Sequence, residues 1–499
     1  FTLSAIAIWL LANIYWLVPY AQNMLAFNSS SGSSVFSFEQ TNTGQFVNFW
    51  RFLGSWGWKE THNFIQYFPF ADNYDRFPLI FLSYMPICIA ILATAIYRKN
   101  KYVAFFSFLS ILGIFLAKGA TPPLGSWYKF TYEHYKFLWI FREPWAKFTP
   151  IYLFSISILF GLGASSLIYR INQKKLRKPY SFLLILFCTL LVAYPLITGE
   201  VIWHQNTGLM RSNYTQIPNY WDDVNEYLKT NTQQGDRVLL LPPTGYAVGY
   251  NWQNGFFAGD TPAMILLDRA TLKYTSYPSN NADKIINEMY EKLYSKPELI
   301  SDYAKMLGFR YVLTDKDVEY NYAYYIKNPP LARKYATEIT QKIESLSDLS
   351  KIYESGSLSL YQIANLEYQP VAKLIDSNGN EIQIDISSEN SSRFVISVGK
   401  IDRDAEYTLR LNNNFSALWQ AKICNDDSCG LVEQNRHVIS DNYANVWKIT
   451  DLLSNSKIIL EYSPENKMNK LKNVSILSII ILFVANLLLF LKTKKKRVK

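Results

Sequence analysis

Histidine and cysteine are scarce in this chain, with four of each among 499 residues. The histidines form no HxxxH or HExxH spacing, which excludes the zinc sites built on those motifs. The glycine-rich patterns that cradle nucleotide phosphates, GxxxxGK[ST] and GxGxxG, are also absent from the sequence. We therefore expect no metal site and no resident cofactor, while a divalent cation brought in with a substrate stays compatible with the sequence.

The four cysteines fall in two environments. Cys88 and Cys188 lie inside apolar runs, where a cysteine is usually a small buried hydrophobe. Cys424 and Cys429 bracket the sequence NDDS in a polar region, where we expect a disulfide that closes the short loop outside the cytoplasm. The weaker alternative is a metal held by these thiols and the two aspartates between them.

Six apolar runs divide the chain. Five are long enough to cross a bilayer, and the sixth, 102–117, is slightly short but lies between two others. The first run has neither the basic leader nor the small-residue cleavage site of a signal peptide. Because the chain begins at Phe1, we expect a fragment or a processed product. The predicted crossings are 3–20, 79–97, 102–117, 148–169, 180–198 and 474–491.

The formal net charge of +10 could indicate a nucleic-acid partner, but its distribution indicates membrane topology instead. Residues 201–470 carry 27 Lys and Arg against 33 Asp and Glu, so the basic excess lies elsewhere. It follows the second, fourth and last crossings, at 98–101, 170–178 and 491–499. Basic residues favour the cytoplasmic side, so the C-terminus is expected there. The regions expected outside are 21–77, 118–147 and 199–473.

These patterns predict an α-helical multi-pass membrane domain with a large extracytoplasmic region. In 201–365, helical and strand patterns alternate, as in an α/β domain. Its first helix is expected near Pro218, with Trp221, Val224 and Leu228 on one stripe. Further helices are expected in NADKIINEMYEKLYS and ELISDYAKMLGF, and strands in RVLLLP, RYVLTD and SLSLYQI.

A second extracytoplasmic domain is expected in 366–470. Short alternating strands at regular spacing predict a β-sandwich there, in FVISVG, YTLRLN, ALWQAKI, VWKIT and KIILEYS. The predicted organisation is therefore 1–200 with five crossings, 201–365, 366–470, and 471–499 with the last crossing and its basic tail.

Aromatic residues are dense in the first outer loop. Phe46, Phe49, Trp50 and Leu53 recur at helical spacing, which predicts a helix lying on the membrane surface. A platform that stacks against sugar rings is the functional alternative.

The stretch WIFREPWAKF, residues 139–148, places charged residues at the start of the fourth crossing. Its loop is rich in basic residues although it is expected outside, which works against the charge rule. A bound anion would explain this. Arg142 can grip phosphate oxygens with two donors, and Lys147 acts as a point charge. Glu143 could orient Arg142 or bind a sugar hydroxyl, and Pro144 suits the first turn of a helix whose N-terminus is partly positive.

A simpler interpretation of the same stretch carries equal weight on the residues alone. Arg142 and Lys147 would contact lipid headgroups, with Trp139 and Trp145 as interfacial anchors.

The run LAKGATPPLGSWY, followed by FREPWAKF, resembles a motif of C-type membrane glycosyltransferases related to the YfhO family and to the mycobacterial arabinofuranosyltransferases. NIYWLVP in the first crossing is similar to another of their motifs. The two parts of the outer region resemble those families in IPNYWDDVNEYL and in LNNNFSALWQAKI. The resemblance adds Lys118 and Tyr128 to the expected donor-binding residues, beside Arg142, Glu143 and Lys147.

This resemblance implies transfer of a sugar from a polyprenyl-phosphate donor to an envelope glycan or lipid on the outer face. A carboxylate in a first outer loop would act as general base, and basic residues would stabilise the leaving phosphate. In similar proteins that carboxylate lies on crossings that precede the NIYWLVP helix, so we expect it upstream of Phe1. Asp72 and Asp75 are the nearest substitutes here, although a structural turn explains them equally simply.

Two other functions fit parts of the sequence. One is a non-catalytic carbohydrate-binding or envelope-assembly membrane protein on a transferase scaffold. The other is an oligosaccharyltransferase, since Tyr220, Trp221 and Asp222 lie where such enzymes keep a WWDYG motif, but only the Trp-Asp pair matches.

The charge distribution predicts where reporters will function. A reporter that is active only in the cytoplasm should work when fused after Lys499 and should fail when inserted near Gly235. The opposite pattern would place the 139–148 stretch on the cytoplasmic face and end the case for an outer-face site.

Overall fold

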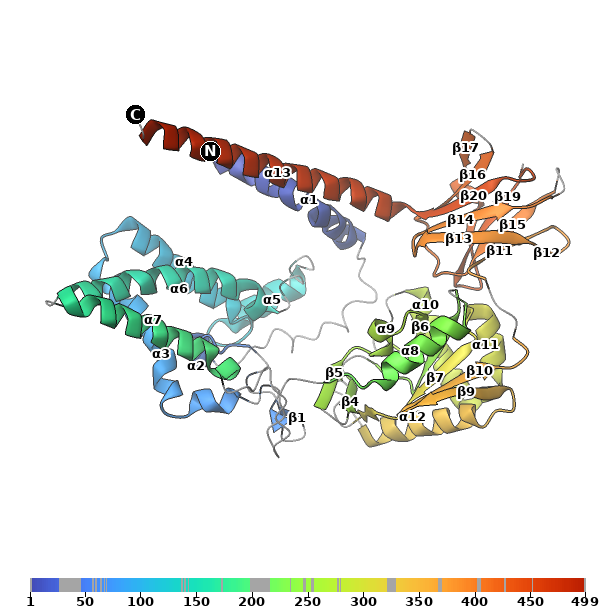
Figure 1. The fold of residues 1–499 in the computed structure, drawn as a ribbon, viewed down its shortest axis with the longest axis horizontal. Coiled ribbons are helices and arrows are strands. Elements are labelled where there is room, and N and C mark those ends of the chain that lie inside the picture. Colours follow the sequence, from blue (N-terminus) through green and yellow to red (C-terminus); the bar gives the residue numbers. More distant parts are fainter. Residues whose placement is uncertain are drawn as a thin grey trace.

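The computed structural model of the chain combines helical segments with sheets, and a last long helix follows the sheets (Figure 1). The residues it describes are 2–26, 46–55, 58, 61–62, 65–66, 68, 70–135, 138, 141, 143–171, 174–197, 216–233, 235–245, 248–252, 255–275, 278, 280–320, 329–366, 370–401, 405–425, 428–450 and 452–497.

Three described helices are long and apolar enough to cross a membrane: Leu79–Ile96, Pro144–Tyr169 and Ser463–Ala485. Two other predicted crossings are shorter apolar helices, Ile6–Ala21 and Lys101–Ala117. The remaining one falls within a helix, Lys174–Ile197. Helical structure at all six positions agrees with the sequence patterns, and the number of crossings stays a prediction.

Helix α6 (Pro144–Tyr169) is the centre of a helical bundle. The Ser110 hydroxyl donates a hydrogen bond to the Ser155 hydroxyl of α6 over 2.8 Å, and Ser155 is fully buried. A satisfied polar pair of this kind suits a helix interface that lies within a membrane. The helices packed on α6 are α3 (Leu79–Ile96), α4 (Lys101–Ala117) and α7 (Lys174–Ile197) (Figure 1).

Two glycines let the backbones of these helices approach closely. A Cβ atom added at Gly113 of α4 would lie 2.8 Å from the backbone nitrogen of Tyr152 in α6. One added at Gly163 of α6 would lie 2.2 Å from the carbonyl oxygen of Ile89 in α3. Any larger residue at either site would force the helices apart, so glycine sets both crossings.

These contacts gather distant loops at one end of the bundle. Gly113 is near the end of α4 and Tyr152 is near the start of α6, so these two helix ends lie together. The Tyr74 hydroxyl of η3 (Ala71–Asp75) donates to the Leu191 carbonyl near the end of α7, over 2.9 Å. The basic turns after α3 and after α6 therefore lie at the opposite end.

The aromatic segment 46–53 differs from its prediction. Only α2 (Phe46–Phe49) is helical, and Phe49 is completely buried instead of lying on a membrane surface. The rings of Phe52 and Tyr152 lie 5.1 Å apart, and the Tyr152 hydroxyl donates to the Trp50 carbonyl over 3.4 Å. Phe49 and Leu53 of this stripe are buried against the bundle, while Phe46 and Trp50 are half-buried. The segment therefore does not form the predicted surface helix, because periodicity alone cannot distinguish burial by protein from contact with lipid.

The first and last helices pack on each other. The Ser475 hydroxyl is buried between them, where it donates to the Leu11 carbonyl over 3.3 Å and accepts from the Tyr15 amide over 3.4 Å. These helices are α1 (Thr2–Ala26) and α13 (Ser463–Arg497), so α13 begins well before the predicted start at residue 474.

The region after residue 215 begins with a mixed five-stranded sheet in the order β6-β3-β7-β10-β9. The first three strands are parallel and the rest are antiparallel. The strands are β6 (Ala270–Leu272), β3 (Arg237–Leu241), β7 (Tyr311–Asp315), β10 (Leu358–Ile363) and β9 (Leu349–Ser355). The predicted strands RVLLLP, RYVLTD and SLSLYQI are confirmed as β3, β7 and β10.

Alternation along β3 buries both faces of this sheet. Leu239 and Leu241 face the cluster formed with α10 (Asn281–Ser295), α11 (Ile300–Leu307) and α12 (Pro329–Glu344). Val238 and Leu240 face α8 (Tyr220–Asn231) and α9 (Ala263–Leu266). Helices therefore cover both faces, as period-two burial in a continuous apolar strand requires. A small sheet is added by β5 (Gly255–Gly259), β4 (Val248–Trp252) and β8 (Val318–Glu319).

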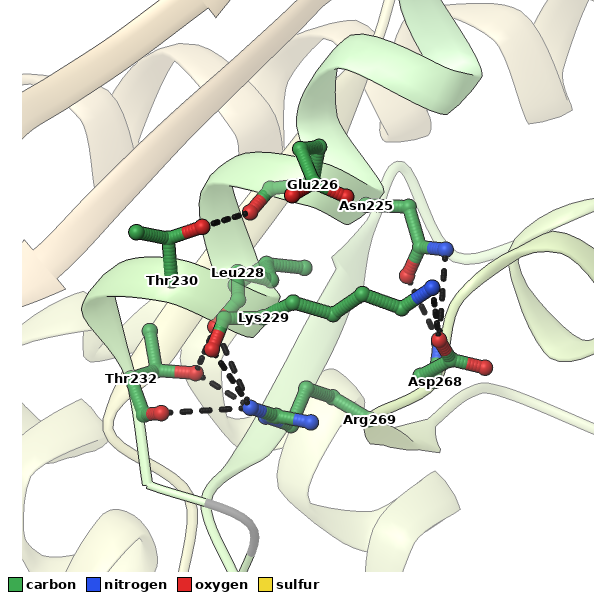
Figure 2. A network of polar contacts seen from close by, with 8 residues as sticks. All are labelled: Asn225, Glu226, Leu228, Lys229, Thr230, Thr232, Asp268 and Arg269. Carbon is green, nitrogen blue, oxygen red and sulfur yellow. Dashed lines mark hydrogen bonds and ion pairs between the residues drawn. The ribbon is translucent and has the colours of Figure 1, made fainter.

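Helix α8 is fixed by a polar network at its C-terminal end (Figure 2). The Arg269 guanidinium donates to the carbonyls of Leu228 and Thr232, at 3.2 and 3.1 Å. The Leu228 carbonyl also accepts from the Thr232 amide over 3.1 Å, so Arg269 adds a charged donor to the last turn of the helix. Lys229 forms an ion pair with Asp268 over 2.5 Å. The expected stripe of Trp221, Val224 and Leu228 is confirmed as buried.

The following region is a sandwich of two antiparallel five-stranded sheets. The predicted strands FVISVG, YTLRLN, ALWQAKI, VWKIT and KIILEYS are confirmed as β14, β15, β16, β19 and β20. One sheet comprises β12 (Glu381–Ile382), β11 (Ala372–Ile375), β15 (Tyr407–Leu411), β19 (Ala444–Ile449) and β18 (His437–Ser440). The other comprises β13 (Ile384–Asn390), β14 (Arg393–Val398), β20 (Lys457–Tyr462), β16 (Trp419–Asn425) and β17 (Ser428–Leu431).

The two cysteines of this region face each other across a hairpin. Cys424 in β16 and Cys429 in β17 are paired in the strand register and joined by a disulfide. The aspartates between them lie outside the described residues. Cys88 and Cys188 are free thiols in α3 and α7.

One arginine joins the α/β unit and the sandwich. From the start of β3, Arg237 donates to the Asn412 carbonyl over 2.5 Å, to Asn413 Oδ1 over 2.9 Å and to the Tyr443 hydroxyl over 2.9 Å. The joint is also apolar, because Tyr443 and Ala444 of the sandwich belong to the core cluster of the α/β sheet. The two units therefore share a continuous, hydrogen-bonded interface.

Two arginine variants should distinguish the role of Arg237 between the two units from the role of Arg269 at the C-terminal end of α8. Arg237→Ala removes a charged donor from three sandwich partners, and charged hydrogen bonds contribute about 1.5–3 kcal/mol each. We expect faster hydrogen–deuterium exchange of amides 412–417, by roughly tenfold or more, with α8 unchanged.

The matched control is Arg269→Ala. It should speed exchange at the C-terminal end of α8 and leave 412–417 unchanged. Equal effects of both variants on both segments would contradict separate roles for the two arginines.

Candidate functional site

The turn after α4 buries Lys118, one of the predicted donor-binding residues. Its ammonium group donates to the Thr121 carbonyl over 2.8 Å and lies 4.8 Å from the centroid of the Phe115 ring. The residue is 1% exposed, and this burial lowers the pKa of the ammonium. We therefore assign Lys118 to stabilising its own turn instead of binding a ligand at the surface.

Helix α5 (Gly125–His134) follows this turn and carries Tyr128. The Tyr128 hydroxyl donates to the Phe141 carbonyl over 2.6 Å. Burial, and secondarily the neighbouring Tyr132, raise the pKa of Tyr128, so its phenol stays protonated and remains a donor. The hydrogen bond fastens the backbone just before Arg142 to α5. Tyr128 thus has a positioning role that its place in the motif did not reveal.

The described part of the FREPWAKF motif forms the start of α6. Pro144 is confirmed in the first turn, which leaves Glu143 at the N-cap with an exposed side chain that makes no capping hydrogen bond. Lys147 is exposed in the same turn, and its amide donates to the Glu143 carbonyl over 3.2 Å. The rings of Phe141 and Phe148 stack with centroids 4.9 Å apart, so a residue before the helix contacts one inside it.

Trp145 is half-buried at this end of the bundle, where it packs against Phe49. Its ring lies 5.3 Å from that of Phe49, measured between centroids. A Cβ atom at Gly54 would lie 2.4 Å from the Trp145 ring, so only glycine leaves room for it there. Sequence reasoning missed this function of Gly54, although the small residues in LGSW were a usable signal for close packing.

The helix start combines several features that suit an anion. A 26-residue helix begins here, and its N-terminus carries a partial positive charge. The Lys147 ammonium lies in its first turn, a place where a helix dipole alone would disfavour a cation. Arg142 and Trp139 lie outside the described residues, so the motif is placed by its neighbours Phe141 and Glu143.

The two substitute carboxylates are not equivalent. Asp75 forms an ion pair with Arg51 over 2.8 Å, and the Arg51 side chain is 2% exposed beneath it. Removing the Asp75 charge would leave a buried guanidinium without its counterion, so Asp75 has a structural reason to be there. Asp72 is exposed in η3. Within the described residues, no group of three or more His, Cys, Asp or Glu side chains is placed to hold a metal ion.

The sandwich carries a separate hollow beside its disulfide hairpin. It has a volume of about 400 Å³. Arg436 donates to the Thr450 hydroxyl at its edge. The polar residues that line it are Asn425, Ser428, Glu433, Arg436 and Thr450.

The motif of the oligosaccharyltransferase alternative is accounted for by the fold. Trp221 is 1% exposed and packs in the core, while Asp222 and Asp223 lie in the first turn of α8. Acidic residues there favour a helix start electrostatically.

Comparisons with known proteins give limited similarity. No protein-family model matches the chain, and no curated protein matches it. Among solved structures, it is similar to the cryo-EM structure of arabinofuranosyltransferase AftD from Mycobacteria, with 11% identity and a TM-score of 0.42 over 91% of this chain and 41% of that one. A single-substitution variant of AftD matches with 11% identity and a TM-score of 0.36 over 77% of this chain and 40% of that one.

This chain thus spans about two fifths of the AftD chains that it matches. With TM-scores below 0.5, this similarity does not by itself establish a shared fold, and arabinofuranosyl transfer is the activity named for those structures. The start of α6 is therefore the candidate site of this chain.

Proposed function

We propose that this chain is part of a membrane glycosyltransferase. It would handle a polyprenyl-phosphate sugar donor at the outer face and pass the sugar to a cell-envelope glycan or lipid. The observation that supports this most is the start of α6, where exposed Lys147 and Glu143 flank a helix N-terminus next to Arg142 in the chain. This end of the bundle is opposite the basic turns, which supports an outer-face position for it.

In this proposal the start of α6 stabilises the leaving group. When the bond between the sugar carbon and the phosphate oxygen breaks, negative charge increases on the phosphate. Arg142 would bind two of its oxygens, while Lys147 and the helix N-terminus lower the energy of the developing charge. Glu143 would orient the guanidinium or accept a hydrogen bond from a sugar hydroxyl.

The acceptor hydroxyl must lose a proton to a base as it attacks the sugar carbon. Asp75 is poorly suited to this role because it is paired with the buried Arg51. Asp72 is exposed in η3. Of these two carboxylates, Asp72 is therefore the one that a substrate could reach.

A non-catalytic, carbohydrate-binding function is the alternative. The polar hollow of about 400 Å³ beside the disulfide hairpin is the feature that favours it. The two functions depend on different sites, because carbohydrate binding would use the sandwich hollow and sugar transfer would use the start of α6.

Changing Arg142 to lysine tests the proposed function. Lysine keeps the positive charge but loses the two-pronged geometry that matches phosphate. We expect a 10- to 150-fold loss in transfer from a polyprenyl-phosphate sugar, which corresponds to about 1.5–3 kcal/mol for a charged hydrogen bond. Binding of polyprenyl phosphate to the detergent-solubilised chain should weaken in parallel, a readout that does not depend on turnover.

Lys129→Ala is the matched control in the same loop. Lys129 is half-exposed and pairs with Glu133 over 3.8 Å one turn along α5. Exposed pairs of this kind contribute little, so the control should keep transfer and binding nearly unchanged. If both variants behave alike, the stretch is a lipid-headgroup contact, and the transferase proposal loses its main support.

A further inference from the structure

Helix α5 has apolar residues on two opposite sides. Its inner side packs through Tyr132, which is 4% exposed, and through Tyr128. Its outer side carries Trp127 and Phe130, which are 70% and 52% exposed, and continues back to Leu124, which is 66% exposed.

The outer residues form one stripe. Trp127 and Phe130 are three apart in α5, so their side chains lie next to each other on the helix, and Leu124 is the N-cap residue that precedes it. The ion pair between Lys129 and Glu133 lies beside them. The exposed side of α5 therefore combines large apolar side chains with polar ones such as Lys129 and His134, as in a helix at a membrane surface. The outer stripe is therefore suited to an apolar surrounding.

The position of α5 indicates what that surrounding is. The end of α4 and the start of α6 lie together, and α5 connects them at this end of the bundle. Helix α4 also presents large apolar side chains outward, with Phe108 63% and Ile111 62% exposed. Both helices thus expose large apolar side chains, and α5 follows α4 at the end where a membrane-crossing helix would meet the headgroup layer.

We propose that the outer stripe of α5, formed by Leu124, Trp127 and Phe130, lies in the boundary between lipid headgroups and acyl chains. Tryptophan favours that layer, since its ring is apolar while its indole nitrogen can donate to polar groups. The hydrogen bond from Tyr128 to the Phe141 carbonyl then ties the backbone that leads into α6 to α5, so the position of α5 in the membrane also fixes the position of that backbone. This proposal does not depend on the chain being a transferase.

The proposal assigns the interfacial role to a different segment from the one that the sequence indicated. The segment 46–53 also carries apolar residues at helical spacing, but Phe49 and Leu53 are buried there, at 0% and 7% exposed. The stripe of α5 remains uncovered by described residues.

The test is a comparison of nitroxide labels on the two sides of α5. The free cysteines Cys88 and Cys188 are first replaced by alanine, and the disulfide of the sandwich is left intact. Labels are attached to Trp127→Cys and to the matched control Lys129→Cys. The whole chain is placed in phosphatidylethanolamine–phosphatidylglycerol vesicles, and collision with oxygen is compared with collision with a water-soluble nickel chelate.

We expect the label at 127 to collide several-fold more with oxygen, relative to nickel, than the label at 129. Phe130→Cys, a second site on the stripe, should behave like 127 and guards against misfolding of one variant. Equal nickel access at 127 and 129 would show that the stripe faces water and would overturn the proposal. Shielding of both 127 and 130 from oxygen and nickel would also overturn it, because protein would then cover the stripe.

Discussion

The close approach of α6 to its neighbours is the constraint on which the membrane part depends. At Gly113 and Gly163 the helix backbones meet without intervening side chains, at distances that no Cβ atom permits. These contacts fix where α6 begins relative to the end of α4. Because the charged motif occupies the first turn of α6, the same contacts determine which loops surround it.

Around that helix start, some side chains are held by packing and others are exposed to a ligand. Lys118 is buried in its own turn, where it donates to the Thr121 carbonyl, and the Trp145 ring packs against Gly54. Glu143 and Lys147 stay exposed on the first turn of the helix. Of the described motif residues at the helix start, these two are the charged ones that a ligand can reach. The helix N-terminus beside them is compatible with an anionic ligand.

The region after residue 215 depends on a polar constraint instead. From the start of β3, Arg237 donates to acceptors in the sandwich, while Tyr443 from the sandwich enters the core of the α/β unit. A half-buried guanidinium is stable only with its acceptors in place, so the two units hold one relative arrangement at this joint. The sandwich then leads directly into α13.

Local patterns determined the elements of this protein. The length of the apolar runs predicted the long apolar helices, the apolar run RVLLLP predicted β3, and the spacing of Trp221, Val224 and Leu228 predicted α8. Each of these patterns depends only on residues close in sequence. The same reasoning identified Arg142, Glu143 and Lys147 as one charged group before a helix. Strands with weaker patterns, such as β9 with its several charged residues, were missed for the same local reason.

Only the tertiary structure decided which surface each pattern meets. Aromatic residues recur at helical spacing both at 46–53 and on α5, yet Phe49 is fully buried while Trp127 and Phe130 are exposed. Spacing encodes that a side is apolar and carries no information on whether protein or lipid covers it. The burial of Lys118, the pairing of Asp75 with Arg51 and the joint at Arg237 likewise depend on contacts between residues distant in sequence, which a single chain read in order does not specify.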